Sequence, residues 1–157
     1  YKRQEILLAI QYVNDVVVYQ EEETFLSYLK DYEKSTFHMA CIVDDKAVTC
    51  ATFYPQTSTK IKSENAYRLR GMATDSNFQR KGYASDLMAA SFKELKKRDC
   101  DIVWCNARLV AVPFYKSVGF KIIGDGESAG AASAHKVSHL FKILDASATR
   151  LLVQSRG

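Results

Sequence analysis

The spacing of apolar residues changes after Ser35. Before it, Gln4–Val13 and Glu23–Glu33 carry apolar residues three or four positions apart, which predicts two helices. Between them, the β-branched Val16–Gln20 is either a short strand or a buried connection. After Ser35, the segments His38–Val43 and Ala47–Tyr54 have the composition and spacing of strands. The short link between them predicts a hairpin, although its Asp44-Asp45-Lys46 sequence lacks the usual glycine.

The middle of the chain alternates between strand and helix patterns. Pro55–Glu64 is polar and is expected to be a loop, and Ala66–Thr74 alternates as a third strand of this region. A helix is expected from Tyr83 to Arg98, because Leu87, Met88, Ser91, Phe92 and Leu95 form a stripe on one face. Its second half carries four cations, which suit the negative end of a helix on a solvated face.

The last third repeats this alternation. Asp101–Asn106 is a short apolar strand, and Leu109–Val118 is a helix with Gly119 at its C-cap. Pro113 fits that helix only near its first turn, or else it kinks the helix. Phe120–Ile123 and Val137–Leu144 are strands, joined by the small-residue loop Gly124–Ala134. We expect one α/β domain over residues 1–157, in which residues 145–157 are a helical or disordered tail.

Composition excludes several classes of protein. The chain of 157 residues is 47% hydrophobic and 25% charged, as in an ordinary globular domain. Its net charge of +4 is too small to argue for nucleic acid. No apolar run is long enough for a membrane span, and no signal peptide opens the sequence. The four cysteines form no metal-binding pattern and are expected to be reduced thiols in or near the core of a cytoplasmic protein.

The stretch Gln79–Ala84 (QRKGYA) is the strongest candidate for a binding site. It lies between a predicted strand and a predicted helix, where the first backbone N–H groups of the helix have no internal partner. Those groups and the helix dipole attract anions, so Arg80 and Lys81 would balance a ligand's charge. Gly82 and the small Ala84 allow close approach of the backbone. Neither of the two common phosphate-loop patterns, G-x-x-x-x-G-K-[ST] and G-x-G-x-x-G, is present.

Two motifs in order resemble the GCN5-related N-acetyltransferase (GNAT) superfamily. Gln79–Ala84 is similar to its acetyl-CoA loop, [QR]-x-x-G-x-[GA], with Ala84 in place of the commoner glycine. Asn106–Arg108, Ala111, Phe114-Tyr115 and Gly119-Phe120 are similar to its later motif. The strand Arg68–Thr74 and His38 also look like those of bacterial members. The resemblance covers residues 37–144 well and the first 36 residues poorly.

The resemblance implies a fold and a function. The fold is a mixed central sheet, splayed between strands 4 and 5 and flanked by helices. The function is acetyl transfer from acetyl-CoA to a primary amine of a small molecule or peptide, by direct attack on the thioester. Nucleic acid, membrane and metal are not expected as partners, and a homodimer stays open. The alternative is a non-catalytic domain of the same fold that binds acyl-CoA.

The resemblance also assigns roles to residues. Tyr115 would protonate the leaving thiolate, and a backbone N–H near Ala73 or Thr74 would bind the oxyanion. Arg70, on a strand, would face an anionic group of the acceptor if it points to the cleft, while His38, His135, His139 and Glu64 are alternatives for the acceptor side or the base. The cofactor-binding set implied by the family is Met72, Ala73, Thr74, Gln79, Arg80, Lys81, Gly82, Tyr83, Ala84, Ser85, Asn106, Phe114 and Tyr115.

Overall fold

The computed structural model describes residues 35–123, 137–147 and 149–151. The predicted helices at Gln4–Val13 and Glu23–Glu33, the strand or connection at Val16–Gln20 and the loop Gly124–Ala134 lie outside these residues. The chain forms two compact units. Unit 1 comprises Tyr1–Pro55 and Leu69–Lys93, and unit 2 comprises Gln56–Arg68 and Glu94–Gly157. The prediction of one domain over the whole chain therefore stays a prediction.

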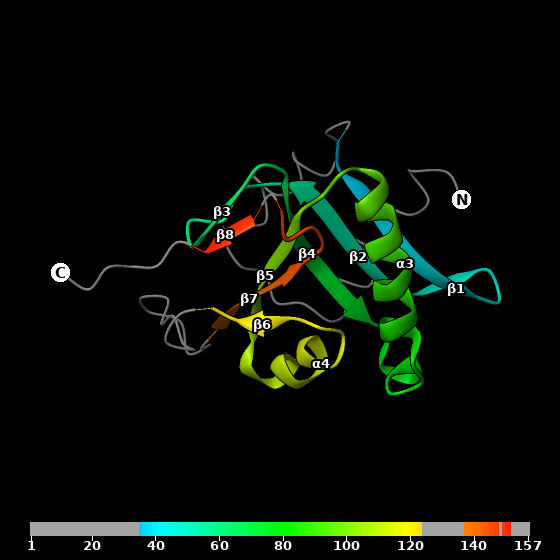
Figure 1. Ribbon diagram of the computed structural model, residues 1–157. Coiled ribbons are helices and arrows are strands. Elements are labelled where there is room, and N and C mark those ends of the chain that lie inside the picture. Colours follow the sequence, from blue (N-terminus) through cyan, green and yellow to red (C-terminus); the bar gives the residue numbers. More distant parts are fainter. Residues whose placement is uncertain (1–34, 124–136, 148, 152–157) are drawn as a thin grey trace, which may run out of the picture. The chain divides into compact units, whose positions relative to one another are not determined.

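Unit 1 contains a hairpin, the end of one further strand and most of a helix (Figure 1). The elements are β1 (Phe37–Val43), β2 (Lys46–Pro55), the second part of β4 (Ala66–Thr74), the 3-10 turn η1 (Ser76–Phe78) and α3 (Tyr83–Lys97). The three strands and the helix were predicted in outline, whereas the 3-10 turn was not. β2 is buried on both faces from Ala47 to Tyr54, which is typical of a central strand.

The hairpin between β1 and β2 turns without glycine. Asp44 and Asp45 both have positive φ, at 48° and 62°, and Val43 pairs with Lys46 across the turn. Two central residues with positive φ define the turn type whose twist matches that of paired strands. Asp tolerates this backbone better than most residues other than Gly and Asn. The predicted hairpin is therefore confirmed, with aspartates in the role that glycine commonly takes.

Unit 2 contains strands of two sheets. The start of β4, β5 (Ile102–Arg108), β7 (Val137–Ile143) and β6 (Lys121–Ile122) are hydrogen-bonded in that order, and β3 (Ile61–Ser63) pairs with β8 (Thr149–Leu151). One cluster of its hydrophobic core contains Ile61, Ala66, Ile102, Trp104 and Phe141. The strands β3 and β8 correct two expectations. A strand interrupts the expected loop Pro55–Glu64, and Thr149–Leu151 form a strand within the tail 145–157, for which the expectation is a helix or disorder.

The pairing of β4 with β5 makes the sheet mixed. These two strands run parallel, whereas β5 and β7 are antiparallel. The parallel register joins Ala66–Arg68 to Ile102–Trp104, while β4 continues to Thr74 and β5 to Arg108. The predicted fold class, an α/β fold with a mixed sheet whose pairing is interrupted between these two strands, is confirmed.

The segment after β5 resolves the difficulty of Pro113. A 3-10 turn, η2 (Leu109–Ala111), comes first, and α4 (Val112–Ser117) then begins with Pro113 in its first turn. A proline is tolerated there because the first helical N–H groups have no partner within the helix. The predicted helix Leu109–Val118 is therefore shorter than expected, and its N-terminal part is 3-10.

Candidate active site

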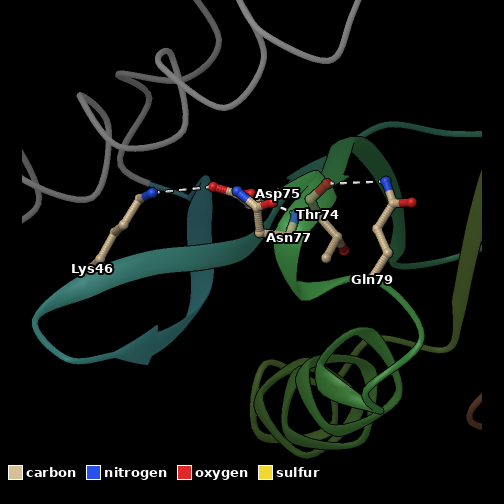
Figure 2. Close-up of polar contacts among 5 residues, drawn as sticks. All are labelled: Lys46, Thr74, Asp75, Asn77 and Gln79. Atoms are coloured by element: carbon tan, nitrogen blue, oxygen red, sulfur yellow. Dashed lines mark hydrogen bonds and ion pairs between the residues drawn. The ribbon is translucent and has the colours of Figure 1, made fainter.

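In unit 1, a set of polar contacts fixes the point where β4 ends and the candidate anion loop begins (Figure 2). The Asp75 carboxylate accepts a hydrogen bond from the Asn77 amide at 2.9 Å and forms an ion pair with Lys46 at 3.1 Å. The Asp75 amide donates to the Val48 carbonyl at 2.8 Å. The Asn77 amide and Lys46 together lower the pKa of Asp75 below its usual value. The end of β4 is thus tied to β2 before the loop starts.

The second half of β4 is irregular at Gly71. Its φ of 62° interrupts the extended backbone, as a strand bulge does. The Gly71 carbonyl lies 4.0 Å from the Cys50 sulfur on β2. Burial raises the pKa of the Cys50 thiol to about 12, and the Ala73 amide beside it acts in the opposite direction. The Ala73 amide therefore points toward β2, and Thr74, the next residue, directs its amide to the other edge of the strand.

The loop Gln79–Gly82 is exposed and has an unusual backbone. Arg80 has a φ of 58° and Gly82 a φ of 86°, with a residue of ordinary φ between them. Alternating signs of φ are the pattern of backbone nests, in which successive N–H groups turn toward one anion. The Gln79 side-chain amide donates to the Thr74 carbonyl at 3.5 Å (Figure 2), and the Asp86 amide begins the helix by donating to Gly82.

Gly82 is required by conformation rather than by crowding. A Cβ added at this position would have no heavy atom within 4 Å, so the space above it is open. Its positive φ, however, strains any residue with a side chain. The predicted close approach of a ligand is compatible with this open space, and a residue with a side chain would fill it.

The side chains around the loop are held by aromatic contacts. The Lys81 ammonium lies 5.4 Å above the centre of the Phe78 ring, and Phe78 lies 6.1 Å from the Tyr83 ring. A cation in this position is attracted by the negative face of the ring. Lys81 is thus partly ordered beside the loop, while Arg80 and Ser85 are exposed and Ala84 is half-buried.

In unit 2, Asn106 belongs to a series of polar side chains that are hydrogen-bonded to one another. Asn106 on β5 pairs with His139 on β7, and the Asn106 Oδ1 lies 2.8 Å from the His139 Nδ1. The other imidazole nitrogen, Nε2, lies 3.1 Å from the Ser58 hydroxyl. His139 is only 8% exposed, and its burial, together with Lys60 and Arg68, lowers its pKa to about 4. The ring is therefore neutral at pH 7.

Tyr115 is fixed by the way α4 ends. The Phe120 amide donates to the Tyr115 carbonyl at 3.0 Å and the Gly119 amide to the Lys116 carbonyl at 3.1 Å, which is the Schellman pattern. Gly119 has the positive φ, 99°, that this ending requires. The same turn packs the Phe120 ring against Tyr115, with ring centres 5.3 Å apart. The Gly-Phe pair of the sequence motif thus holds Tyr115 in place.

The Tyr115 hydroxyl is in a buried setting. The residue is 8% exposed, and the Phe114 ring lies 5.3 Å from its own ring. Burial raises the pKa of the phenol well above its usual value, and Cys105 adds to this effect. Tyr115 is consequently protonated at neutral pH.

The remaining predicted site residues fall into different places. The Nδ1 of His38 lies 2.9 Å from the Thr52 hydroxyl across the hairpin, and Arg70 and Met72 are half-buried on β4. Glu64 is exposed and uses its backbone amide to bind Asp101. His135 lies outside the described residues. None of these placements tests the acceptor roles that the sequence suggested.

Several residues near His139 carry no signal in the sequence. The Trp104 ring stacks on His139 at 4.9 Å, and its indole N–H donates to the Gln56 carbonyl at 2.8 Å. The Arg68 guanidinium lies over the Trp104 ring, 5.0 Å from its centre. The pairing of β5 with β7 brings His139 beside Trp104, and the pairing of β4 with β5 brings Arg68 beside Trp104. Neither pairing can be read from residue spacing.

Two negative findings apply to the part of the chain that is described. Among residues 35–123, 137–147 and 149–151, no group of three or more potential ligands is arranged to hold a metal ion. Within the same residues, no helix is long and apolar enough to cross a membrane.

Comparison with known proteins decides the family. The model of the acetyltransferase (GNAT) family matches residues 5–120. The chain belongs to this family. Over 98 residues it is 32% identical to the uncharacterized N-acetyltransferase YitI of Bacillus subtilis (strain 168), a match that covers 62% of this chain and 66% of that protein. The matched stretch thus spans slightly less than two thirds of this relative's length.

Solved structures of GNAT enzymes share the fold. The crystal structure of an aminoglycoside 6'-N-acetyltransferase complexed with coenzyme A has a TM-score of 0.73 at 12% identity, covering 92% of this chain and 94% of that chain. The ribosomal-protein-S18-alanine N-acetyltransferase of Escherichia coli has a TM-score of 0.64 at 18% identity, covering 88% of each chain. At these identities the likeness shows the fold alone.

The lowered pKa of His139 predicts a pH-dependent stability. The neutral ring is favoured in the folded state, whereas an unfolded His titrates near about 6.5. The stabilisation is therefore complete above pH 6.5 and is lost as the pH falls toward about 4. We expect the free energy of unfolding of the wild type to fall more steeply over this range than that of His139→Asn. Urea titrations at pH 7.5, 5.5 and 4.5 would check this, and parallel curves for the two proteins would contradict it.

Proposed function

We propose that this protein transfers the acetyl group of acetyl-CoA to a primary amine. The observation that carries the proposal is the exposed loop Gln79–Gly82, whose left-handed Arg80 and Gly82 lead into the N-terminus of α3. A pyrophosphate suits this backbone because the N–H groups and the helix dipole both favour negative charge. The loop also has the acetyl-CoA pattern of a family to which the chain belongs.

The family pattern assigns roles to residues within each unit taken by itself. In unit 1, the amides of Arg80–Ser85 hold the pyrophosphate, with Gln79 tying the loop to β4 and Lys81 adding charge. Met72, Ala73 and Thr74 form the strand segment for the pantetheine arm. In unit 2, the family pattern assigns Asn106 a hydrogen bond to the cofactor and Phe114 a place beside a thioester. These assignments rest on the family pattern and on the exposure and backbone geometry of each residue.

The chemistry asks two things of this chain. Acetyl-CoA supplies an activated thioester that a neutral amine can attack directly. The Thr74 amide is the better candidate for binding the developing oxyanion, because the Ala73 amide points toward β2. Tyr115, protonated and held by Phe120, gives its proton to the departing thiolate. His139 is a poor general base, since both of its nitrogens are engaged and its pKa is about 4.

A panel of primary amines separates the proposal from the alternative, a domain that binds acyl-CoA without catalysis. We expect thiol release from acetyl-CoA above the no-amine background with at least one class of amine, including aminoglycosides, polyamines and peptides with a free N-terminus. Release would be followed with a thiol reagent, and coenzyme A binding by calorimetry. Binding without release for any amine would favour the alternative, and no binding would refute both. A cytoplasmic location and a homodimer remain predictions beside this test.

Tyr115→Phe isolates the proton donor. The variant keeps the ring that packs between Phe114 and Phe120, so fold and coenzyme A affinity should stay within about twofold. Turnover should fall about 10²- to 10⁴-fold, as for loss of a positioned acid. Steady-state rates with the best amine and calorimetry with coenzyme A would measure both quantities. Unchanged turnover across pH 6–10 would exclude the role.

The anion loop is best tested at Arg80 rather than at Gly82. Any residue placed at Gly82 is strained by its φ of 86°, so lost binding there would not separate contact from misfolding. Arg80→Gly removes a cation but relieves the left-handed backbone, and should stabilise the fold by about 1 kcal/mol. We expect the double variant Arg80→Gly/Lys81→Gln to weaken coenzyme A binding about tenfold at low salt.

A matched control comes from the other end of the same helix. Lys96→Gln removes an exposed cation from the last turn of α3 and should leave the dissociation constant for coenzyme A unchanged. Calorimetric titrations at 50 and 300 mM salt would compare the three proteins. Equal coenzyme A affinity of the double variant and the wild type would show that the cations of this loop do not contribute to binding.

A further inference from the structure

The His139 side chain is built into a hydrogen-bonded series that leads to Asn106. A neutral imidazole has a single N–H, and the Asn106 Oδ1 at 2.8 Å from Nδ1 can only accept. The proton therefore lies on Nδ1, and Nε2 must accept, which the Ser58 hydroxyl at 3.1 Å satisfies by donating. Ser58 in turn accepts from the Lys60 backbone amide at 3.2 Å. Every polar atom in the series has one consistent role.

This series decides which end of the Asn106 amide is presented to solvent. The Asn106 side chain is exposed, but its oxygen is engaged with His139. The NH₂ group, with its two donor hydrogens, is the end that remains for a ligand. A ligand atom that binds there must be an acceptor, such as the carbonyl oxygen of an amide.

The surroundings hold His139 in this orientation. Its ring stacks on Trp104 at 4.9 Å, and Trp104 is anchored by its bond to the Gln56 carbonyl. Asn106 and His139 are also direct partners in the β5–β7 ladder, so the backbone fixes their separation. Ser58 and His139 are 6% and 8% exposed, and water competes little for their hydrogen bonds.

We propose that His139 positions Asn106, and that Ser58 fixes the His139 tautomer, so that Asn106 donates a hydrogen bond to an amide carbonyl of the pantetheine arm. This inference rests on the proposed function, since the pantetheine arm belongs to coenzyme A. Neither His139 nor Ser58 touches the ligand. Both act through Asn106 and are positioning residues.

The same three side chains could be mistaken for a nucleophilic triad of Ser, His and Asn. Two observations separate them from one. The Ser58 hydroxyl is buried and also holds the Lys60 amide, so a substrate carbonyl does not reach it. The His139 ring sits under Trp104 with both nitrogens bonded, which suits orientation rather than proton transfer.

The first experiment measures coenzyme A binding in matched variants. His139→Asn places an amide N–H₂ near the former Nδ1 and should keep the affinity, whereas His139→Phe keeps the ring and removes the donor. We expect His139→Phe and Asn106→Ala each to raise the dissociation constant about three- to tenfold. The double variant should lose no more than either alone, because both remove the same contact. Thermal unfolding of each variant confirms that it folds.

The outcomes separate this inference from the proposed function. Wild-type affinity in His139→Phe, or additive losses in the double variant, would overturn the positioning role while leaving acetyl transfer intact. No loss in Asn106→Ala would do the same. Absence of coenzyme A binding by the wild type would overturn the proposed function itself.

A second experiment needs no ligand. In protein labelled with ¹⁵N-histidine, the ring nitrogen shifts and couplings distinguish the Nδ1–H from the Nε2–H tautomer. His139 is identified among the three histidines by the signal that His139→Phe removes. We expect Nδ1–H in the wild type and a mixture of tautomers in Ser58→Ala. The Nε2–H form in the wild type would refute the inference even if every variant binds coenzyme A as expected.

Discussion

The hydrogen bonding of β4 is the constraint on which the candidate site depends. Its first three residues pair in parallel with β5, and beyond Arg68 the strand passes into unit 1. There the amides of Ala73 and Asp75 are turned toward β2, and Asp75 also caps the short turn before the loop. The loop therefore begins from a fixed point. Because successive amides of β4 point to opposite edges of the strand, the one between Ala73 and Asp75 is directed away from β2.

The predictions from sequence succeeded where one short stretch carries the whole signal. The loop Gln79–Ala84 and the helix after it could be located because glycine, cations and helical spacing fall within a few residues. The Gly119 ending of α4 was readable for the same reason, and the structure adds why the following phenylalanine matters. β3 and β8 were missed because each has three residues, and only their mutual pairing makes them strands.

The environment of Asn106 shows a different limit of sequence reasoning. Asn106 itself stood out through its motif, but His139 and Ser58 lie 33 and 81 positions away from their partners in the series. Residue spacing contains no information on such pairs until the register of β5 and β7 is known. His139 was considered as a base, and only its burial and its two bonded nitrogens indicate the opposite role. Whether a histidine accepts a proton or stays neutral and orients a neighbour is thus decided by how it is packed.

The backbone of Arg80 has a consequence beyond ligand binding. An arginine with a φ of 58° occupies a conformation that glycine would adopt at lower cost. The chain thus keeps a charge at the expense of local stability, in an exposed loop where no packing demands it. The backbone cost and the positive charge at this position therefore act in opposite directions on the protein.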